Sequence, residues 1–217
     1  MEEKPVVFVI DDDASIRKAL SNLLKSVGFD PRPFASAQDF LKSTPPHVPS
    51  CIVSDIRMPG LSGLDLQHEL AKAKRWVPIV FITGHGDIPM SVRAMKSGAV
   101  DFLAKPFREQ DLLDAVKAGI ERDAGRRKNE GAVSDVRRRF ETLTRREQEV
   151  MKSVVNGLLN KQIASSMGLS EVTVKVHRSH LMRKMQAKSL AELIHMANLL
   201  GMTAAAPNAP HTGVLVG

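Results

Sequence analysis

The sequence predicts an α/β fold, a doubly wound parallel sheet of five strands, followed by a small all-α domain. Over the first 120 residues, short apolar runs alternate with helix-like segments, which is typical of buried parallel strands covered by helices. Beyond residue 140, four helical patterns follow one another. Residues 1–120 hold equal numbers of acidic and basic side chains, so the net charge of +7 lies in residues 121–217. We therefore expect two domains, the second basic enough to bind nucleic acid.

Four predicted strands are short apolar runs rich in β-branched and aromatic residues. They are residues 6–10, 51–54, 79–82 and 102–104. Residues 30–34 form a further strand, which Pro31 and Pro33 place at a sheet edge because proline cannot donate a ladder hydrogen bond. Asp13 is the expected N-cap of the first helix, and Gly28 ends it. The predicted helices are residues 14–27, 36–41, 64–73, 88–97 and 112–120.

Polar capping residues mark the starts of four helices in the second domain. Their positions are Thr144 with Glu147, then Asn160, then Ser170, and then Ser189 with Glu192. Two short helices joined by the turn at residues 167–170 predict a helix-turn-helix.

The predicted boundaries are residues 1–123 for the first domain and 140–202 for the second. Residues 124–139 are highly charged and have little apolar periodicity, so we expect a solvated linker or a helical extension frayed at Gly125 and Gly131. Residues 203–217 are rich in Ala and Pro and are expected to be a disordered tail.

The composition argues against several classes of protein. No apolar stretch approaches the roughly 18 residues of a membrane span, and the N-terminus lacks the basic and then apolar pattern of a signal peptide. We therefore expect no membrane partner and a cytoplasmic location. The single Cys51 lies in a predicted buried strand and is expected to be a core residue rather than a reactive thiol. No Cys/His metal cluster is indicated.

Polar side chains stand at the ends of the predicted strands. Their order is Asp11 and Asp12 after the first strand, Asp55 ending the third, Thr83 after the fourth and Lys105 after the fifth. The carboxyl ends of parallel strands share one edge, where ligands bind. Three neighbouring carboxylates repel one another, and the usual relief is a hard divalent cation, Mg²⁺ or Mn²⁺. The pattern predicts a phosphoryl-acceptor site in which Asp55 is the nucleophile, Lys105 pairs with one phosphoryl oxygen and Thr83 donates to another.

Each of these residues alone has an ordinary explanation. A run of aspartates after a strand often caps the next helix, a threonine at a strand end is usually without function, and a Lys-Pro dipeptide is usually a turn. Their joint order along the chain favours the site.

Four segments resemble the receiver domain of bacterial two-component response regulators, over about residues 4–123. They are residues 9–12 (Val-Ile-Asp-Asp), 54–60 (Ser-Asp-Ile-Arg-Met-Pro-Gly), 81–85 (Phe-Ile-Thr-Gly-His) and 101–107 (Asp-Phe-Leu-Ala-Lys-Pro-Phe). The resemblance implies a flavodoxin-like fold and phosphoryl transfer from a sensor histidine kinase to Asp55. It also implies that Asp12 binds Mg²⁺ directly, Asp11 mainly through water and Arg57 through its backbone carbonyl.

The same resemblance implies a conformational switch formed by Thr83 and Phe102. Phosphorylation adds about −1.5 to −2 charge, so a Thr83 hydroxyl drawn inward would leave space into which Phe102 could turn, changing the surface of residues 88–97. Without the motif, Phe102 would be interpreted as a core aromatic. Arg57 and His85 resemble positions that tune the lifetime of the phosphate in this family.

The predicted helix at residues 171–185 has one buried and one exposed face. At 100° per residue, Val174, Leu181 and Met185 form a buried stripe. The opposite face fits the major groove of double-stranded DNA, although it could also be a plain surface helix with a mixed polar face. The candidate DNA-binding residues are Val172, Thr173, Lys175, Val176, Arg178, Ser179 and Arg183. Among them, Thr173 and Arg178 suit backbone contacts, which position the protein without reading sequence.

Three segments resemble the LuxR-type helix-turn-helix of FixJ/NarL response regulators, over about residues 140–200. They are residues 143–150 (Leu-Thr-Arg-Arg-Glu-Gln-Glu-Val), 160–164 (Asn-Lys-Gln-Ile-Ala) and 172–178 (Val-Thr-Val-Lys-Val-His-Arg). The resemblance implies that Lys175 and Val176 contact bases. It also implies a homodimer through the last helix, using Leu193, Ile194 and Ala197. Ser179 stands where some relatives carry lysine, so the DNA target is not implied.

Together these patterns predict a FixJ-type transcription factor that is phosphorylated, dimerises and binds a two-fold operator. Activation, with RNA polymerase as a further candidate partner, is more typical of the family than repression. Two alternatives have different signatures. An aspartyl phosphatase would need a carboxylate two residues beyond Asp55, where Arg57 stands, so no enzyme is expected. A DNA-binding adaptor with a degenerate receiver would lack marker residues that this chain has.

Overall fold

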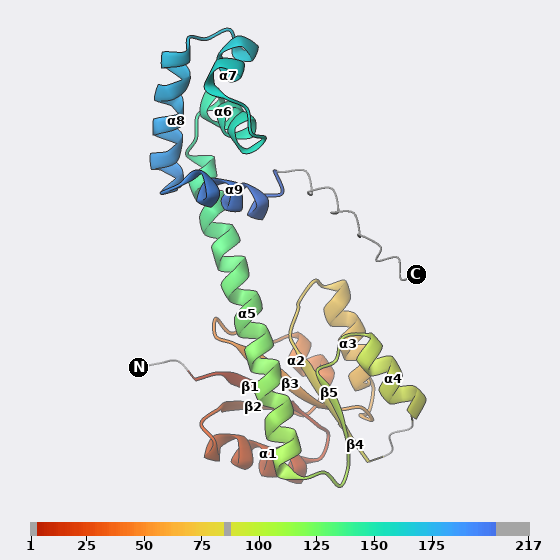
Figure 1. Cartoon of the computed structure of the whole chain (residues 1–217). Helices are drawn as coiled ribbons and strands as arrows, with labels where there is room; N and C mark the ends of the chain where they lie inside the picture. The colour runs from red at the N-terminus through yellow and green to blue at the C-terminus, as the bar shows by residue number, and fades with distance from the viewer. Residues whose placement is uncertain (1–3, 85–87, 203–217) are drawn as a thin grey trace, which may run out of the picture. The chain divides into compact units, whose positions relative to one another are not determined.

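The computed structural model describes residues 4–84 and 88–202. The chain forms two compact units, Met1–Lys128 and Asn129–Gly217, which are described separately (Figure 1). The division falls inside the segment for which a linker is predicted. His85 and the predicted tail at residues 203–217 lie outside the described residues.

The first unit contains the predicted parallel sheet of five strands. The strands are β1 (Val6–Ile10), β2 (Asp30–Phe34), β3 (Ser50–Asp55), β4 (Ile79–Thr83) and β5 (Asp101–Ala104). Their order is β2-β1-β3-β4-β5, so β2 is the edge strand that its prolines predict. The order reverses between β1 and β3, which is the switch point where ligands bind in such sheets.

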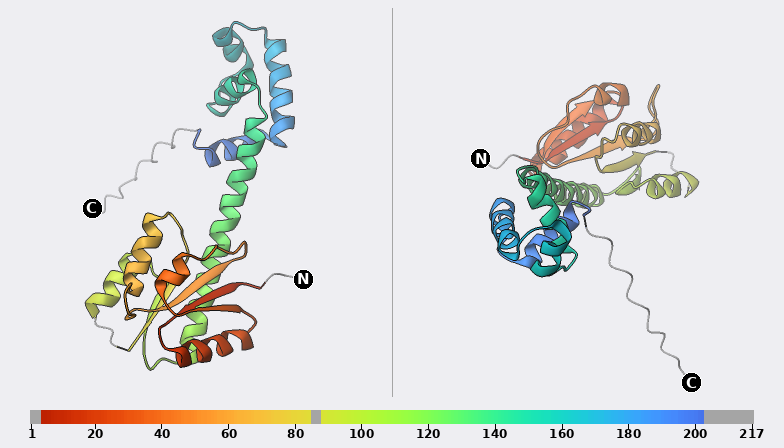
Figure 2. Two further views of the ribbon diagram at one scale, coloured as in Figure 1. Left: turned by 180° about the vertical axis from the view of Figure 1, so that it is seen from behind. Right: turned by 90° about the horizontal axis from the view of Figure 1, so that it is seen from above.

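Helices cover both faces of this sheet (Figures 1 and 2). The helices of this unit are α1 (Ala14–Ser26), α2 (Ala37–Leu41), α3 (Gly63–Lys72), α4 (Ile88–Lys96) and the first part of α5 (Glu109–Glu141). Successive residues of β1 point to opposite faces, so Val7 packs with α1 and α5 while Phe8 packs with α2, α3 and α4. The α/β fold and its doubly wound topology are therefore confirmed.

Cys51 lies in the core between β3 and α5. Its side chain has no exposed surface, and burial raises the pKa of the thiol to about 12. A Cβ placed on Gly119 of α5 would come within 2.6 Å of the Cys51 sulfur, so this helix packs closely on the strand. The prediction of a core residue rather than a reactive thiol is confirmed.

Helix α5 runs for 33 residues, through both Gly125 and Gly131. Of the two predicted forms of residues 124–139, the helical one is present, and the fraying at the glycines is wrong. A glycine in a helix costs about 1 kcal/mol relative to alanine. Across Gly125 this cost is offset by Asp123, whose carboxylate accepts hydrogen bonds from Arg126 and Arg127 in the next turn.

Up to residue 202, where its described part ends, the second unit contains the end of α5 and four further helices. These are α6 (Arg145–Val155), α7 (Asn160–Met167), α8 (Glu171–Met185) and α9 (Leu190–Leu199). The predicted capping box of Thr144 and Glu147 is present. Gly168, with a φ of 65°, makes the turn between α7 and α8, as the helix-turn-helix pattern predicts. Among the described residues, no helix is both long and apolar enough to span a membrane.

One predicted cap is wrong, because α7 begins after Leu159 and Asn160 is its first residue. The Gln162 side chain reaches back to accept from the Leu159 amide at 2.8 Å, which satisfies the helix start without Asn160. The Asn160 side chain instead accepts a hydrogen bond from Arg178 of α8.

Candidate phosphoryl-acceptor site and nucleic-acid interface

The carboxyl edge of the sheet brings together the five residues predicted to form the phosphoryl-acceptor site. Asp11 and Asp12 follow β1, Asp55 and Thr83 end β3 and β4, and Lys105 follows β5. One carboxylate oxygen from each of the three aspartates lies within 4.8 Å of the other two. Residues separated by more than 90 positions in the sequence therefore share one site.

The loop after β1 is held by its own side chains. The Asp13 carboxylate accepts from the amides of Ser15 at 2.7 Å and Ile16 at 3.3 Å, as predicted for the N-cap of α1. These backbone hydrogen bonds lower the pKa of Asp13. The Asp13 amide in turn donates to Asp11 Oδ1 at 2.9 Å. The loop thus fixes the carboxylate of Asp11 while Asp12 stays exposed.

Lys105 pairs with Asp11 and not closely with Asp55. Its Nζ lies 3.1 Å from Asp11 Oδ2 and 3.8 Å from Asp55 Oδ1, and the second distance is too long for a hydrogen bond. The Lys105 amide donates to the Thr83 carbonyl at 2.7 Å, which ties the end of β5 to the end of β4. The ammonium group is therefore held beside the carboxylates from a neighbouring strand.

Asp55 is nearly buried, and its carboxylate is incompletely satisfied. The residue is 9% exposed, and Oδ1 has no hydrogen-bond partner within the described part of the chain. Burial raises the pKa of Asp55, an effect that Lys105 opposes and that Asp11 reinforces. Buried polar atoms normally have partners, so this oxygen has room for one that the protein does not supply. A hard divalent cation with oxygen ligands fits such a donor set.

The two residues of the predicted switch lie on the neighbouring strands β4 and β5, two residues apart in register. Thr83 is 1% exposed and pairs in register with Ala104, while Phe102 pairs with Phe81 two residues earlier. Phe102 is half-buried and packs in the same hydrophobic cluster as Met90 of α4. The packing therefore connects the carboxyl edge of the sheet to α4.

Two site residues were missed from the sequence. A Cβ on Gly63 would lie 2.5 Å from the Asp55 carbonyl oxygen, so only glycine allows α3 to begin this close to the site. Arg17 donates from α1 to the Asp11 carbonyl oxygen at 2.7 Å. A glycine shortly after a turn and an arginine on an amphipathic helix are both common, so neither gave a signal. Arg57 was singled out, and it lies exposed in the turn after β3.

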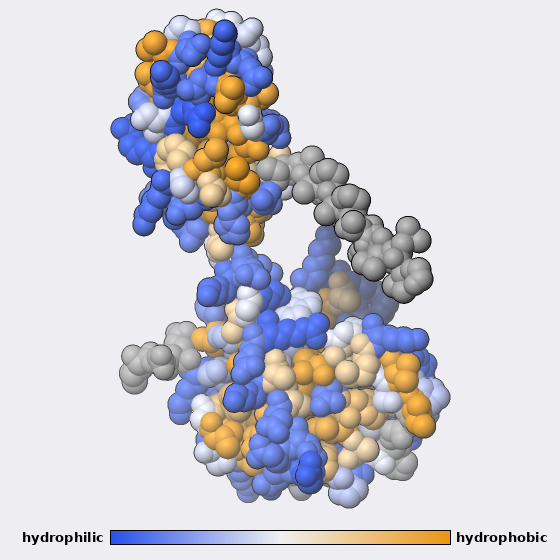
Figure 3. All heavy atoms as spheres, in the orientation of Figure 1, coloured by the Kyte–Doolittle hydropathy of each residue, from blue (hydrophilic) through white to orange (hydrophobic). Residues whose placement is uncertain are grey.

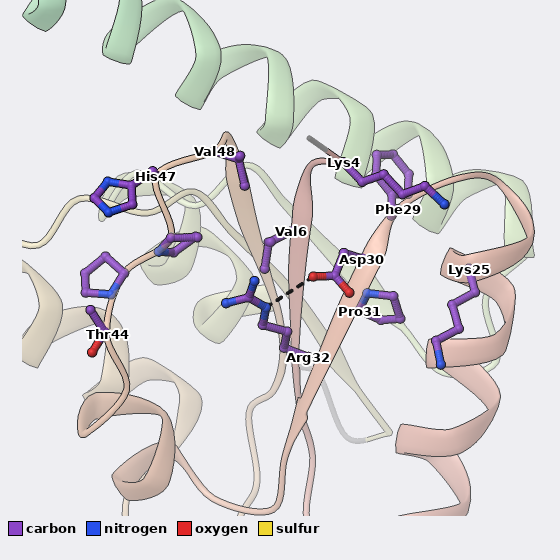
Figure 4. A pocket seen from close by; sticks show the side chains of 12 residues that line it. Lys4, Val6, Lys25, Phe29, Asp30, Pro31, Arg32, Thr44, His47 and Val48 are labelled. Carbon is purple, nitrogen blue, oxygen red and sulfur yellow. Dashed lines mark hydrogen bonds and ion pairs between the residues drawn. The ribbon is translucent and has the colours of Figure 1, made fainter. Parts of the chain in front are cut away.

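A pocket of about 840 Å³ lies at the opposite, amino edge of the sheet (Figure 4). It is lined by the starts of β1 and β2 and by residues 44–48, with Asp30 and Arg32 paired across 3.2 Å. None of the five site residues lines it. This hollow therefore lies apart from the acidic carboxyl edge of the sheet.

Helix α8 has the two faces that its periodicity predicts. Val174, Leu181 and Met185 are fully buried in the core of the second unit. On the outer face Val172 is 70% and Val176 48% exposed. The other exposed members of the predicted DNA-binding set are Lys175, Ser179 and Arg183. An exposed helix face with apolar and basic side chains matches what the major groove accepts.

Thr173 and Arg178, the predicted backbone contacts, are half-buried and have partners within the unit. The Thr173 hydroxyl lies 2.8 Å from the hydroxyl of Ser170, the N-cap of α8. Arg178 donates to Asn160 Oδ1 at 2.8 Å, which joins α8 to the start of α7. Both side chains are thus held in place before any ligand is bound.

The predicted dimer surface on α9 requires correction. Leu193 and Ala197 have no exposed surface and belong to the core of the second unit, while Ile194 is half-buried. Residues four apart on a helix share a face, and here that face packs inward against the unit's own core. Leu193 and Ala197 therefore cannot contact a second copy of the folded chain. Of the large apolar side chains of α9, that of Leu190 is exposed.

Comparison with known proteins agrees with this division of the chain. Residues 7–117 match the response regulator receiver domain, and residues 141–197 match the luxR family of bacterial regulatory proteins. Nodulation protein W of Bradyrhizobium diazoefficiens is 58% identical, over 93% of this chain and 88% of that protein. The transcriptional regulatory protein FixJ of Azorhizobium caulinodans is 45% identical, over 94% and 97%.

Solved structures give the same result. The response regulator StyR has a TM-score of 0.82 and 50% identity, over 90% of this chain and 99% of that one. Full-length FixJ from B. japonicum has a TM-score of 0.54 and 43% identity, over 92% and 98%. The chain therefore belongs to the two-component response regulators that join a receiver domain to a LuxR-type helix-turn-helix, and it is a transcriptional regulator of that family.

Proposed function

We propose that Asp55 accepts a phosphoryl group from a phosphohistidine of a sensor kinase. A carboxylate oxygen of Asp55 attacks phosphorus, the phosphorus–nitrogen bond breaks, and its electron pair returns to the imidazole, which takes up a proton. The observation that carries this proposal is the buried Oδ1 of Asp55, which has no hydrogen-bond partner among the described residues. Such an oxygen is available to react, and it lies beside Lys105.

A divalent cation, Mg²⁺ or Mn²⁺, would be held by Asp12 and Asp55 directly, with the Arg57 carbonyl as a further ligand. Asp11 would act mainly through water, because both of its carboxylate oxygens already accept hydrogen bonds, from the Asp13 amide and from Lys105. When bound, the cation neutralises the negative charge of the carboxylates and of the incoming phosphoryl group. The exposed side chain of Asp12 leaves it open to such a ligand.

Lys105 and Thr83 would hold the remaining phosphoryl oxygens. Lys105 is already 3.8 Å from Asp55 Oδ1, so a small movement places its ammonium against a phosphoryl oxygen. Thr83 would donate its hydroxyl to another, and Phe102 would turn into the space that is left. Because Phe102 and Met90 of α4 pack against the same hydrophobic cluster, this rearrangement would reach α4.

The surface of α4 is our candidate for homodimerisation in place of the buried residues of α9. Ile88 is 80%, Val92 44% and Met95 45% exposed on this short helix. Figure 3 shows hydrophobic side chains at the surface over α4. Exposed apolar patches of this kind mark protein contacts, and phosphorylation would change this one through Phe102.

The second unit would bind a two-fold operator in double-stranded DNA, in the cytoplasm, with one α8 in each of two major grooves. Lys175 and Val176 would contact bases, and Thr173 and Arg178 the backbone. Contact with about three phosphates per monomer gives a slope of roughly −5 for log affinity against log salt concentration in a dimer. The regulator would act as an activator, with RNA polymerase as its partner at the promoter.

No catalysis on a separate substrate is proposed. A phosphatase of the aspartyl type needs a carboxylic general acid two residues beyond the nucleophile, and the exposed Arg57 stands there instead. Loss of phosphate from Asp55 would then be slow hydrolysis of the chain's own acyl phosphate.

Intact-mass measurement after incubation with Mg²⁺ and acetyl phosphate tests the proposal, with Asp55→Asn as the control. We expect one added phosphoryl group in the wild type, none in the control, and a shift to dimer on a sizing column. Folded wild-type protein that gains no phosphoryl group would discard Asp55 as acceptor and favour a receiver that works as a protein-interaction module.

A further inference from the structure

Arg17 reaches back from the first turn of α1 to the loop that carries the aspartates. Its Nη1 donates to the backbone carbonyl oxygen of Asp11 at 2.7 Å, and its side chain is half-buried. The Arg17 amide donates to the Asp13 carbonyl at 3.0 Å, so the same residue also closes the start of the helix. Both ends of Arg17 are therefore tied to one three-residue loop.

The carbonyl that Arg17 holds belongs to the peptide between Asp11 and Asp12. A peptide is planar, so fixing its oxygen also fixes the nitrogen and Cα with which Asp12 begins. Asp12 is exposed, yet its carboxylate lies within the 4.8 Å cluster with Asp11 and Asp55. Its place in the cluster therefore depends on the backbone that Arg17 holds.

The position of the guanidinium also matters electrostatically. A cation beside three carboxylates ordinarily pairs with one of them and then competes with a metal ion. Arg17 hydrogen-bonds to a carbonyl oxygen instead, so it adds positive charge to the loop and leaves the carboxylates of Asp12 and Asp55 open. The Asp11 carboxylate is held separately, by the Asp13 amide and by Lys105.

We propose that Arg17 is a positioning residue for the metal site, which holds the Asp11–Asp12 peptide so that Asp12 meets the cation without rearrangement. This role rests on the proposed function, because it concerns the divalent cation proposed there. Groups that orient metal ligands from outside the coordination sphere typically change metal affinity 10–100-fold when they are removed. With a single hydrogen bond lost, we expect about the lower limit.

Titration of the unphosphorylated full chain with Mn²⁺, following free Mn²⁺ by electron paramagnetic resonance, tests this role without any phosphoryl transfer. Arg17→Met keeps the apolar stem and removes the donors, and we expect the dissociation constant to rise about tenfold. Arg17→Lys keeps the charge and a hydrogen-bonding ammonium group, and it should restore part of the affinity. Lys18→Met is the matched control, since the exposed neighbour Lys18 loses the same charge.

Several outcomes would overturn the proposal. One is an Arg17→Met variant that circular dichroism shows to be folded and that binds Mn²⁺ as tightly as the wild type. Another is Lys18→Met that weakens binding equally, because the effect would then not be specific to the Arg17 hydrogen bond; the lost positive charge by itself favours binding of a cation. If Arg17→Met does not fold, Arg17→Lys takes its place, and its Mn²⁺ affinity is compared with those of the wild type and Lys18→Met. Failure of the wild type itself to bind Mn²⁺, or equal binding by Asp12→Asn, would instead refute the proposed metal site.

Discussion

Strand β3 begins beside one buried carboxylate and ends with another, and the two have opposite surroundings. At the amino edge, Asp123 of α5 has no exposed surface and accepts from the Ser50 amide at 2.8 Å, from Arg126 at 2.7 Å and from Arg127 at 2.6 Å. At the carboxyl edge, Asp55 has an oxygen without a hydrogen-bond partner among the described residues.

The difference separates a structural carboxylate from a reactive one. Every hydrogen bond that Asp123 accepts stabilises the folded chain, and none of its oxygens is left for a ligand. Burial raises the pKa of Asp55, so keeping its carboxylate charged costs stability. One of its oxygens remains available for chemistry. Burial of a carboxylate therefore does not by itself indicate function, whereas a buried carboxylate oxygen without a hydrogen-bond partner marks a candidate site.

Replacing Asp123 is expected to give the largest loss of stability. Asp123→Ala removes the carboxylate that accepts from the buried Ser50 amide and from two arginines, so the free energy of unfolding should fall by about 3 kcal/mol. The single tryptophan, Trp76, lies under the guanidinium groups of Arg122 and Arg126, so its fluorescence reports urea unfolding of this unit.

Asp114→Ala is the control for this variant, because Asp114 lies on the same helix with its side chain exposed. Its loss should be within about 0.5 kcal/mol. A comparable loss in both variants would show that the charge of α5, and not the buried hydrogen bonds of Asp123, stabilises the unit.

Gly63 tests how tightly the reactive edge is packed. In Gly63→Ala the added Cβ meets the Asp55 carbonyl oxygen at 2.5 Å, so the backbone must shift, at a cost of about 1–3 kcal/mol. We also expect slower phosphorylation by acetyl phosphate, because the shift moves the nucleophile. Gly125→Ala is the contrasting control: its Cβ meets open space, so helix propensity should stabilise the chain by up to about 1 kcal/mol.

These residues also show which features of the fold and of the site can be predicted from the sequence. The acidic edge and α8 could be predicted because strand ends and helical periodicity fix which side chains gather together. Gly63 could not, since its role depends on the distance between α3 and the Asp55 carbonyl, and no local pattern encodes that distance. The role of Asp123 likewise depends on tertiary contacts that no local pattern encodes. Leu193 was misassigned because an apolar stripe predicts burial but not whether the covering surface belongs to the same chain or to a second copy.

Glu147 is a third buried carboxylate, in the second unit, and it resembles Asp123 rather than Asp55. It is 3% exposed and accepts from the Thr144 amide at 2.8 Å and from Lys184 at 2.6 Å. Burial acts to raise its pKa, but these hydrogen bonds outweigh it and the pKa is lowered. Glu147→Gln should therefore destabilise this unit by about 1.5 kcal/mol at pH 7.

The sign of the pH dependence follows from the lowered pKa. Glu147 contributes stability above its unfolded value near 4.5, and this contribution is lost as the pH falls through the folded pKa. The difference in stability between wild type and Glu147→Gln, measured by amide hydrogen exchange in α6, should disappear as the pH falls through that range. Glu149→Gln, on the exposed side of α6, should show little difference at any pH. An unchanging gap for Glu147→Gln would contradict the ionic role.

Asp55→Asn should change the free energy of unfolding least, and it should stabilise the first unit where the other substitutions at carboxylates destabilise theirs. In the presence of a metal chelator at pH 7, Asp55→Asn removes a buried charge that Asp11 and Asp12 repel, so it should stabilise the first unit by about 1 kcal/mol. Because burial raises the pKa of Asp55 above 3.8, the charged form costs stability only above that range. Asp55→Asn should therefore raise the urea midpoint of unfolding, followed by Trp76 fluorescence, by less as the pH falls toward 4.

Adding Mg²⁺ sharpens this last comparison. A ligand that binds only the folded state stabilises it by mass action, so Mg²⁺ should raise the stability of the wild type more than that of Asp55→Asn and reverse their order. Asp123→Asn should show no such reversal, since the wild-type Asp123 carboxylate already accepts hydrogen bonds from Ser50 and the two arginines. If Mg²⁺ stabilised the wild type and Asp55→Asn equally, the Asp55 carboxylate would not be a metal ligand, and the contrast between the two ends of β3 would concern stability alone.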